Sequence, residues 1–332
     1  MKPTVIAKTI NALLDAGNLR ALYISGPPGT AKTSIPEQVA AARGIGCIKS
    51  HVPTMPVDDF GVPFPNADKD GLTYLLNDRF PLEGSDWPEE GILIADELGQ
   101  ADGPAQKGWA NIIQSREIHG RKLKAGWLIV GTGNRTSDRA GAQRMLTHLK
   151  DRMTEIEADM SIDDWGQWAL KNDVHPVVVA FSRFDKDFYS FDANQDHNAT
   201  FRGWTEGVSP IVGNVPPEAE YEMFKGSVGE AMATKFAAFL TMYRSLPNPD
   251  AVIMDPTGTP VPDEPSVRFA LCGALSSRVT VDSFPAICTF VRRLPAEFAT
   301  MAILDCIRKV PEVQATRSYI DWATTDGKAV IL

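Results

Sequence analysis

The sequence lacks any hydrophobic run long enough to cross a bilayer, and its first residues show no apolar segment or cleavage site of a signal peptide. Its four cysteines, at positions 47, 272, 288 and 306, stand singly, with neither a disulfide framework nor zinc-site spacing. The five histidines are not spaced as metal ligands either. We therefore expect no membrane insertion, no cysteine-held metal and a cytoplasmic location.

Excess positive charge is also lacking. The chain has 33 Lys and Arg against 42 Asp and Glu, which gives a formal charge of -9 over 332 residues. Wrapping nucleic acid over a broad face requires cations that neutralise phosphates, so this charge argues against such a face but does not exclude a small basic patch. The composition, 43% hydrophobic and 23% charged, is ordinary for a globular protein, and the length favours two or three domains.

The pattern of apolar residues divides the chain in two. Up to about residue 157, the apolar runs LRALYISG, CIKSHVP, GILIADE, GWLIVGTGN and MTEIEAD alternate with helical stretches such as SIPEQVAAAR and GPAQKGWANIIQS. Strands separated by helix-length segments predict a parallel sheet covered on both faces. Beyond about residue 160, spacings of three and four predict helices. We expect an α/β core over 1–157 and a helical region over 158–332.

The octet GPPGTAKT follows the first of these strands. Phosphate binding at a strand-to-helix turn needs inward-pointing N–H groups, and Gly26 and Gly29 allow the backbone to approach the oxygens. Lys32 supplies a positive charge for the β- and γ-phosphates, and the Thr33 hydroxyl can ligate Mg²⁺. The alternative is a rigid turn without a ligand. The predicted nucleotide-binding residues are Gly26, Pro27, Pro28, Gly29, Thr30, Ala31, Lys32 and Thr33.

Ala31 stands where the usual pattern has its second glycine. There the loop is already turning into the following helix, so we expect the right-handed conformation, in which the small Cβ of alanine is acceptable. The signature is weakened by this residue but not broken.

The run GILIADELGQA predicts a buried strand that ends in two carboxylates. Ligands of open α/β sheets bind at the carboxyl edge, which places Asp96 and Glu97 beside the phosphates. There Asp96 would hold Mg²⁺ through water, and Glu97 would act as general base on the attacking water. A strand followed by an acidic helix cap is the alternative, but the octet upstream favours a hydrolase.

The strand in GWLIVGTGN brings Asn134 to the same edge. A neutral amide there can orient the attacking water or contact the γ-phosphate without changing the charge balance. The same residue could equally be a turn-forming asparagine.

Together, GPPGTAKT, LIADE and VGTGN, followed by RAGAQRMLTHLKDRMTEIE, resemble an AAA+ ATPase of the MoxR-type, dynein-related branch, found in bacteria and phages. The resemblance is strongest between residues 24 and 205. It implies a P-loop AAA+ core with an αβα parallel sheet, an all-helical lid and a C-terminal helical extension. It also implies ATP and Mg²⁺ as ligands, a ring, usually a hexamer, and remodelling of a partner protein, often one with a von Willebrand factor A-type domain.

In such rings a neighbouring subunit donates an arginine to the ATP site, and the matching position is Arg152 in LKDRM. A guanidinium there can neutralise charge on the γ-phosphoryl group in the transition state; the alternative is a surface cation at a helix end. Arg139 and Arg144 are further candidates at the same interface; the equal alternative for them is a role in surface salt bridges. For the lid arginine that contacts the nucleotide, FRGWTE makes Arg202 the candidate, with Arg278 in LSSRVTV as the alternative.

Two inserts in the core, residues 53–86 and 116–126, bear on the use of ATP. The resemblance implies that both engage a partner or substrate at the pore or top face of the ring, although a solvated loop and an ordinary polar hairpin are the alternatives. Two other functions stay open, a nucleic-acid-stimulated motor or loader and an ATP-binding scaffold with negligible turnover. The suspected contact residues are Phe60, Arg116, Arg121, Lys122 and Lys124.

Overall fold

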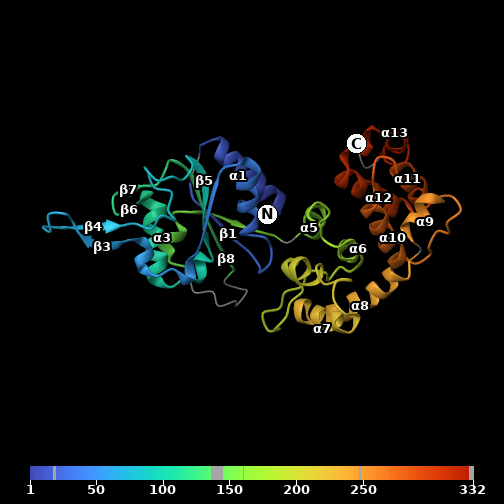
Figure 1. Cartoon of the computed structure of the whole chain (residues 1–332), viewed down its shortest axis with the longest axis horizontal. Helices are drawn as coiled ribbons and strands as arrows, with labels where there is room; N and C mark the ends of the chain where they lie inside the picture. Colours follow the sequence, from blue (N-terminus) through green and yellow to red (C-terminus); the bar gives the residue numbers. More distant parts are fainter. Residues whose placement is uncertain (18–19, 136–144, 160, 247, 329–332) are drawn as a thin grey trace. The chain divides into compact units, whose positions relative to one another are not determined.

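A computed structural model describes residues 1–17, 20–135, 145–159, 161–246 and 248–328. The chain forms two compact units, Met1–Ser161 and Ile162–Leu332. The first contains the strands, and the second is helical (Figure 1).

The first unit is built on a five-stranded parallel sheet in the order β2-β5-β8-β1-β9. All five predicted strands are present in it. Because the strands are parallel, the ends of β1, β2, β5 and β8 lie along one edge. The bounds are β1 (Leu22–Ser25), β2 (Gly46–His51), β5 (Glu90–Asp96), β8 (Gly126–Gly133) and β9 (Thr154–Glu157).

Helices cover both faces of this sheet. On one face, α1 (Pro3–Asp15) and α2 (Ser34–Arg43) pack over alternate strand residues that include Ile24 and Ile94. On the other face, α3 (Gly103–Ser115) and α4 (Thr147–Lys150) pack over residues that include Tyr23 and Ile129. Strands buried on both sides are apolar at consecutive positions, as these are. The predicted fold class, a three-layer parallel α/β core followed by a helical part, is confirmed.

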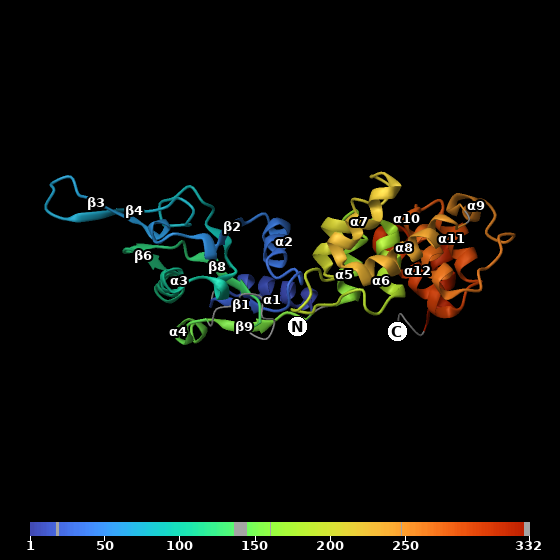
Figure 2. The ribbon, with the colours of Figure 1, turned by 90° about the horizontal axis from the view of Figure 1, so that it is seen from below.

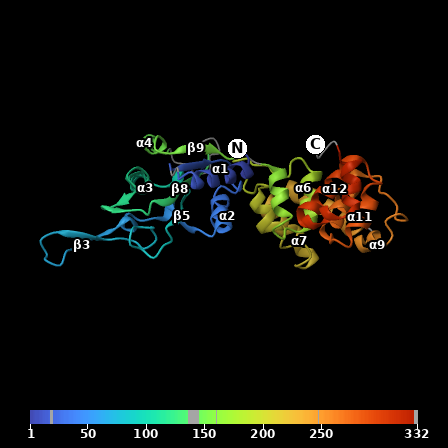
Figure 3. The same cartoon turned by 90° about the horizontal axis from the view of Figure 1, so that it is seen from above.

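Two small antiparallel hairpins stand outside the main sheet. The first pairs β3 (Val62–Pro65) with β4 (Leu72–Leu75), after the 3-10 turns η1 (Val52–Thr54) and η2 (Val57–Phe60). It extends away from the sheet in every view (Figures 1, 2 and 3). The second pairs β6 (Glu117–Ile118) with β7 (Arg121–Lys122).

Three of the residues suspected of contacting a partner serve the fold instead. Phe60 is buried and stacks with the ring of Phe80. Arg116 donates hydrogen bonds to the main-chain oxygens of Lys124 and Trp127, and the Lys124 side chain is itself buried and ion-paired. The expectation for these three residues was wrong because their side chains hold the inserts against the core. The suspected basic residues that stay exposed are Arg121 and Lys122.

The second unit contains two apolar clusters. One surrounds Phe181, Trp204 and Phe236, and the other surrounds Phe290 and Trp322. None of the helices in the described ranges is long and apolar enough to cross a membrane. The helices are α5 (Ile162–Ala169), α6 (Pro176–Phe184), α7 (Pro217–Val228), α8 (Glu230–Arg244), α9 (Pro249–Met254), α10 (Pro265–Ser277), α11 (Phe284–Val291), α12 (Ala296–Lys309) and α13 (Arg317–Thr324), with a π-helix at Gly203–Val208.

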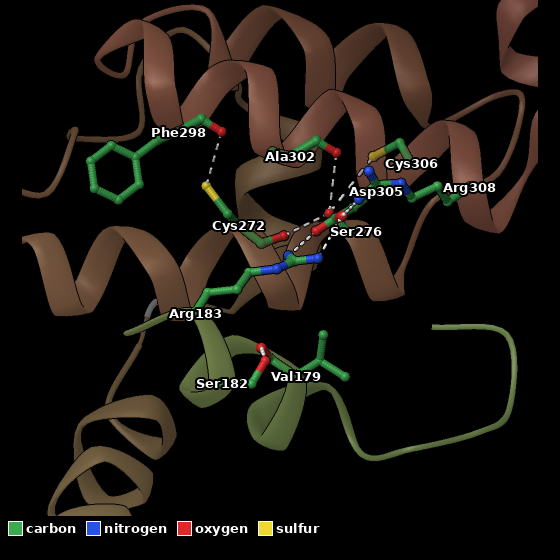
Figure 4. Close-up of polar contacts among 10 residues, drawn as sticks. All are labelled: Val179, Ser182, Arg183, Cys272, Ser276, Phe298, Ala302, Asp305, Cys306 and Arg308. Carbon is green, nitrogen blue, oxygen red and sulfur yellow. Dashed lines mark hydrogen bonds and ion pairs between the residues drawn. The ribbon is translucent and has the colours of Figure 1, made fainter. Parts of the chain in front are cut away.

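A buried ion pair joins the two clusters (Figure 4). Asp305 on α12 has no exposed surface, and the Arg183 guanidinium from α6 donates to both of its carboxylate oxygens. Arg308 adds a third donor at 3.3 Å. Since both carboxylate oxygens are matched by the guanidinium fork, the pair fixes α6 against α12.

Candidate nucleotide-binding and hydrolysis site

The loop between β1 and α2 is held tightly from within. A side chain at Gly26 would place its Cβ 2.8 Å from the main-chain oxygen of Ala158. Gly29 has a φ of 71°, in the left-handed region that favours glycine. The buried Thr30 hydroxyl donates to the Pro27 oxygen at 2.7 Å. The loop is therefore preorganised by its own contacts.

Ala31 differs from expectation. Its φ is 61°, so the residue is left-handed and not right-handed. The chain becomes helical only at Ser34, three residues later, and until then the loop needs a turn that glycine adopts freely. For an alanine this conformation costs roughly 1–2 kcal/mol. The departure from the usual pattern is thus a source of strain in the loop.

Lys32 and Asn134 meet although they are 102 positions apart in the sequence. The Lys32 ammonium donates to the Asn134 side-chain oxygen at 3.1 Å and to the Pro27 main-chain oxygen at 2.7 Å. Both acceptors are neutral, so the positive charge of the lysine is not cancelled by them. The ammonium is held over the loop, where it can serve an anion.

Asp96, at the end of β5, collects hydroxyl donors from two other segments. The Thr33 hydroxyl donates to Asp96 Oδ1 at 2.6 Å, and the Thr132 hydroxyl donates to the same oxygen at 2.7 Å. Thr132 also accepts a hydrogen bond from the Glu97 N–H at 3.1 Å. The buried Thr132 side chain therefore sets the orientation of both acidic residues.

Sequence analysis missed Thr132. The register of β5 and β8 pairs Ala95 with Gly131, so the next residues, Asp96 and Thr132, are neighbours across the strands. A hydroxyl at the end of GWLIVGTGN was the available signal, but its meaning depends on β8 being the neighbour of β5.

His51 is a second residue that the sequence did not reveal. It ends β2, opposite Asp96 in the parallel register. Its ring nitrogens lie 3.9 Å from Asp96 Oδ2 and 3.7 Å from Glu97 Oε2. The imidazole therefore faces both carboxylates at the sheet edge, beyond direct hydrogen-bond distance.

Glu97 combines an open side chain with a strained backbone. Its φ is 56°, in the left-handed region, and its side chain is 42% exposed. Non-glycine residues hold such conformations only where the surroundings enforce them, and these positions cluster at functional sites. Here the enforcing contact is the hydrogen bond from its N–H to Thr132.

The donor set fits Mg²⁺ together with a nucleotide. Mg²⁺ prefers hard oxygen ligands and is usually held by one or two carboxylates plus phosphates. Thr33 and Asp96 place two such oxygens side by side next to the loop. Within the described ranges no group of three or more His, Cys, Asp or Glu side chains could hold a metal alone. These residues therefore fit a metal that phosphate oxygens help to bind.

The candidate arginines differ in how far they are already engaged. Neither Arg152, which follows α4, nor Arg202, beside the π-helix, has a side-chain hydrogen bond or ion pair with any residue that the structure describes. Arg278, in contrast, is ion-paired with Asp250. Arg139 and Arg144 lie outside the described residues.

A parallel sheet whose first strand leads into this loop, a lysine and a helix, with an aspartate at the end of a neighbouring strand, has the features of the P-loop class of nucleotide-binding folds. The loop, Lys32, Thr33 and Asp96 supply those features here.

No protein-family model and no curated protein matches the chain. Among solved structures it is similar to a RuvB mutant of Thermotoga maritima, with 15% identity, a TM-score of 0.41 and coverage of 81% of this chain and 80% of that one. NtrX of Brucella abortus has 14% identity to this chain and a TM-score of 0.40, with coverage of 92% of this chain and 67% of that one. A DNA polymerase III gamma-subunit-related protein of Thermotoga maritima has 9% identity and a TM-score of 0.33, with coverage of 98% of this chain and 92% of that one. Likenesses this loose establish neither activity nor assembly.

Proposed function

We propose that this chain is a Mg²⁺-dependent ATPase of the AAA+ class, and within it of the MoxR type. The observation that carries the proposal is the convergence of the loop, Lys32, Asp96 and Asn134 at one edge of the sheet, from three separate strands. A phosphate-binding loop alone would suit many proteins. A carboxylate beside it at Glu97 favours hydrolysis, since the nearest basic group that the described residues offer it is His51 at 3.7 Å.

Each residue has a role that its position supports. The loop N–H groups and Lys32 bind the phosphates, while Thr33 and Asp96 would hold Mg²⁺, which draws charge from the phosphates when bound. Glu97 accepts the proton of the attacking water, and Asn134 orients that water or the γ-phosphate. Thr132 keeps Asp96 and Glu97 in register for these tasks.

The site is completed in a homo-oligomeric ring, for which a hexamer is the expected size. Arg152 of a neighbouring subunit neutralises charge that develops on the γ-phosphoryl group. Arg202 is favoured over Arg278 as the lid arginine, because Arg278 is already neutralised by Asp250. Hydrolysis then drives remodelling of a cytoplasmic partner protein, with a von Willebrand factor A-type protein as the expected class.

The two other functions lose support. A nucleic-acid motor relied on Lys122 and Lys124 of the basic hairpin, of which Lys122 is exposed but Lys124 is buried and ion-paired with Glu89. A scaffold without turnover requires neither the carboxylate of Glu97 nor the guanidinium of Arg152.

The test measures phosphate release from Mg-ATP per subunit over a wide range of protein concentration. We expect a specific rate that rises with concentration, and a loss of at least about 100-fold in Glu97→Gln, the usual share of a general base. Binding of a fluorescent ATP analogue by Glu97→Gln should persist. An unchanged rate in this variant would contradict the assignment of Glu97.

Mixing variants tests the shared site directly. Arg152→Ala should bind the analogue normally and lose activity by roughly 1,000-fold, as removal of an arginine finger does. A mixture of Arg152→Ala and Glu97→Gln should then exceed the summed rates of the two, because some interfaces combine an intact Glu97 with a neighbour's intact Arg152. No recovery in mixtures that demonstrably co-assemble would place Arg152 outside the neighbouring site.

A further inference from the structure

The β3–β4 hairpin exposes large apolar side chains on both of its faces. We call Val62, Phe64, Leu72, Tyr74 and Leu75 the hairpin surface. Phe64 is 55% exposed and Leu72 is 67% exposed. Elsewhere in the described part of the first unit, the exposed large apolar residues are Met1, Val5 and Val57. Large apolar side chains that are exposed together on one segment are typical of interaction sites.

The register separates the two faces. Val62 pairs with Leu75 and Phe64 with Thr73, so Val62, Phe64 and Leu75 share one face. On the opposite face, the Tyr74 ring stacks on His119 with a centroid distance of 3.6 Å. This stack fixes the hairpin against the β6–β7 turn. The first face lies on the side of the hairpin opposite this stack.

Main-chain pairing does not explain the exposure. β3 contains Pro63 and Pro65, which have no N–H to donate to a further strand. Prolines on an edge are a device that prevents edge-to-edge association of copies. A contact on this hairpin would therefore use the side chains of the hairpin surface and not the β3 edge.

The charge of the segment favours one kind of occupant. Residues 57–76 contain four aspartates, at 58, 59, 68 and 70, and one lysine, at 69, so the net charge is 1 − 4 = −3. Such a segment repels phosphate backbones, anionic lipid and the same hairpin of another copy. It attracts cations. Apolar side chains among carboxylates match a polypeptide that carries both large apolar and basic residues.

We propose that the hairpin surface docks a cationic, apolar segment of a partner polypeptide. This inference rests on the proposed function and names the chemistry of the protein segment that the ATPase engages. Docking uses Val62, Phe64 and Leu75 for apolar contact, and the neighbouring aspartates for orientation and rate of encounter.

The test uses the full chain and three fluorescein-labelled probes of matched length, a Leu/Lys peptide, a Leu/Glu peptide and oligo-dT. Fluorescence anisotropy should show binding of the Leu/Lys peptide alone. The double variant Phe64→Ser, Leu75→Ser should weaken this binding at least tenfold, although it keeps every charge of the protein. Met254→Ser, which removes an 86% exposed apolar residue on α9, should bind as the wild type does.

Basal phosphate release separates this proposal from the ATPase assignment. Phe64→Ser, Leu75→Ser should keep the basal rate, whereas Glu97→Gln should lose the rate and still bind the peptide. Equal binding of the Leu/Glu peptide or preferential binding of oligo-dT would overturn the proposal. So would Leu/Lys affinity that the double variant leaves unchanged, or self-association in sedimentation that the double variant abolishes.

Discussion

The contacts of the charged side chains differ between the carboxyl edge of the sheet and the interior of the helical unit. At the edge, Lys32 donates to the neutral oxygens of Pro27 and Asn134, Glu97 has an open carboxylate, and Ala31 holds a strained conformation. In the helical unit, Asp305 and Glu220 are buried, and each accepts the two prongs of an arginine fork. Groups left open are available to a ligand, while groups closed on each other hold the packing. The comparison predicts where substitutions affect turnover and where they affect stability.

The largest expected effect is on stability, at the buried ion pair of the helical unit. Asp305→Ala should lower the free energy of unfolding by about 3–5 kcal/mol, since it leaves the Arg183 guanidinium, 17% exposed, without its partner. Asp250→Ala breaks an Arg–Asp pair of the same chemistry whose side chains are 50% and 54% exposed, and should cost about 1 kcal/mol or less. Urea unfolding of both variants measures the difference.

An equal loss of unfolding free energy in the two variants would contradict this expectation. Burial would then have no effect on how much an Arg–Asp pair stabilises the protein. If Asp305→Ala does not fold, Asp305→Asn keeps the shape and serves in its place. Nucleotide binding by the folded fraction should match that of the wild type.

The sequence predicted those features that depend on local pattern. The strands were legible as apolar runs, and the loop, Lys32 and the two carboxylates as a motif. Thr132 and His51 were missed because their roles depend on which strands are neighbours: β8 and β2 flank β5, an order that the linear pattern does not contain. Phe60 and Lys124 were misjudged because burial in an insert depends on tertiary contacts, not on composition.

Thr132→Val tests the effect of a substitution at the carboxyl edge of the sheet on turnover. The substitution keeps the shape but removes the donor to Asp96 and the acceptor for the Glu97 N–H. We expect a fall in turnover of roughly tenfold or more, because Asp96 and the Glu97 main chain lose the contact that positions them for the reaction, with nucleotide affinity little changed.

Steady-state kinetics and analogue titration separate these two effects. Ser at the same position restores the hydroxyl and should recover most of the rate. A variant that loses affinity and turnover in equal measure would show that Thr132 supports the whole loop and not the two acidic residues.

The pH dependence of stability tests a second ion pair of the helical unit, between Glu220 and Arg244. Arg244 hydrogen bonds, with help from the Gly213 N–H, lower the pKa of Glu220 below its ordinary value of 4.5. A carboxylate with a lowered pKa in the folded state stabilises the protein above its unfolded pKa, and that contribution is lost as the pH falls through the folded pKa. The difference in stability between the wild type and Glu220→Gln should therefore shrink below about pH 4.5.

Urea unfolding of both proteins at steps from pH 6 to pH 3 measures this difference. The pKa of the neighbouring His175 is also lowered, chiefly by burial, and its protonation contributes at higher pH; because the Glu220 carboxylate acts to raise that pKa, Glu220→Gln lowers it further. A difference that stays constant to pH 3 would mean that the fork contributes nothing through the charge of Glu220.

Ala31→Gly is expected to have the smallest effect and the opposite sign. The left-handed φ of 61° costs alanine about 1–2 kcal/mol that glycine does not bear, although glycine loses more chain entropy on folding. A net gain in stability of up to about 1 kcal/mol should follow, in contrast to every substitution above. Gly44→Ala, at a left-handed helix cap with open space around its Cβ, is the matched reverse and should destabilise by a similar amount. If Ala31→Gly destabilised the protein, the left-handed conformation of Ala31 would not be a source of strain. The methyl group of Ala31 would then stabilise the loop, as packed side chains stabilise the interior of the helical unit.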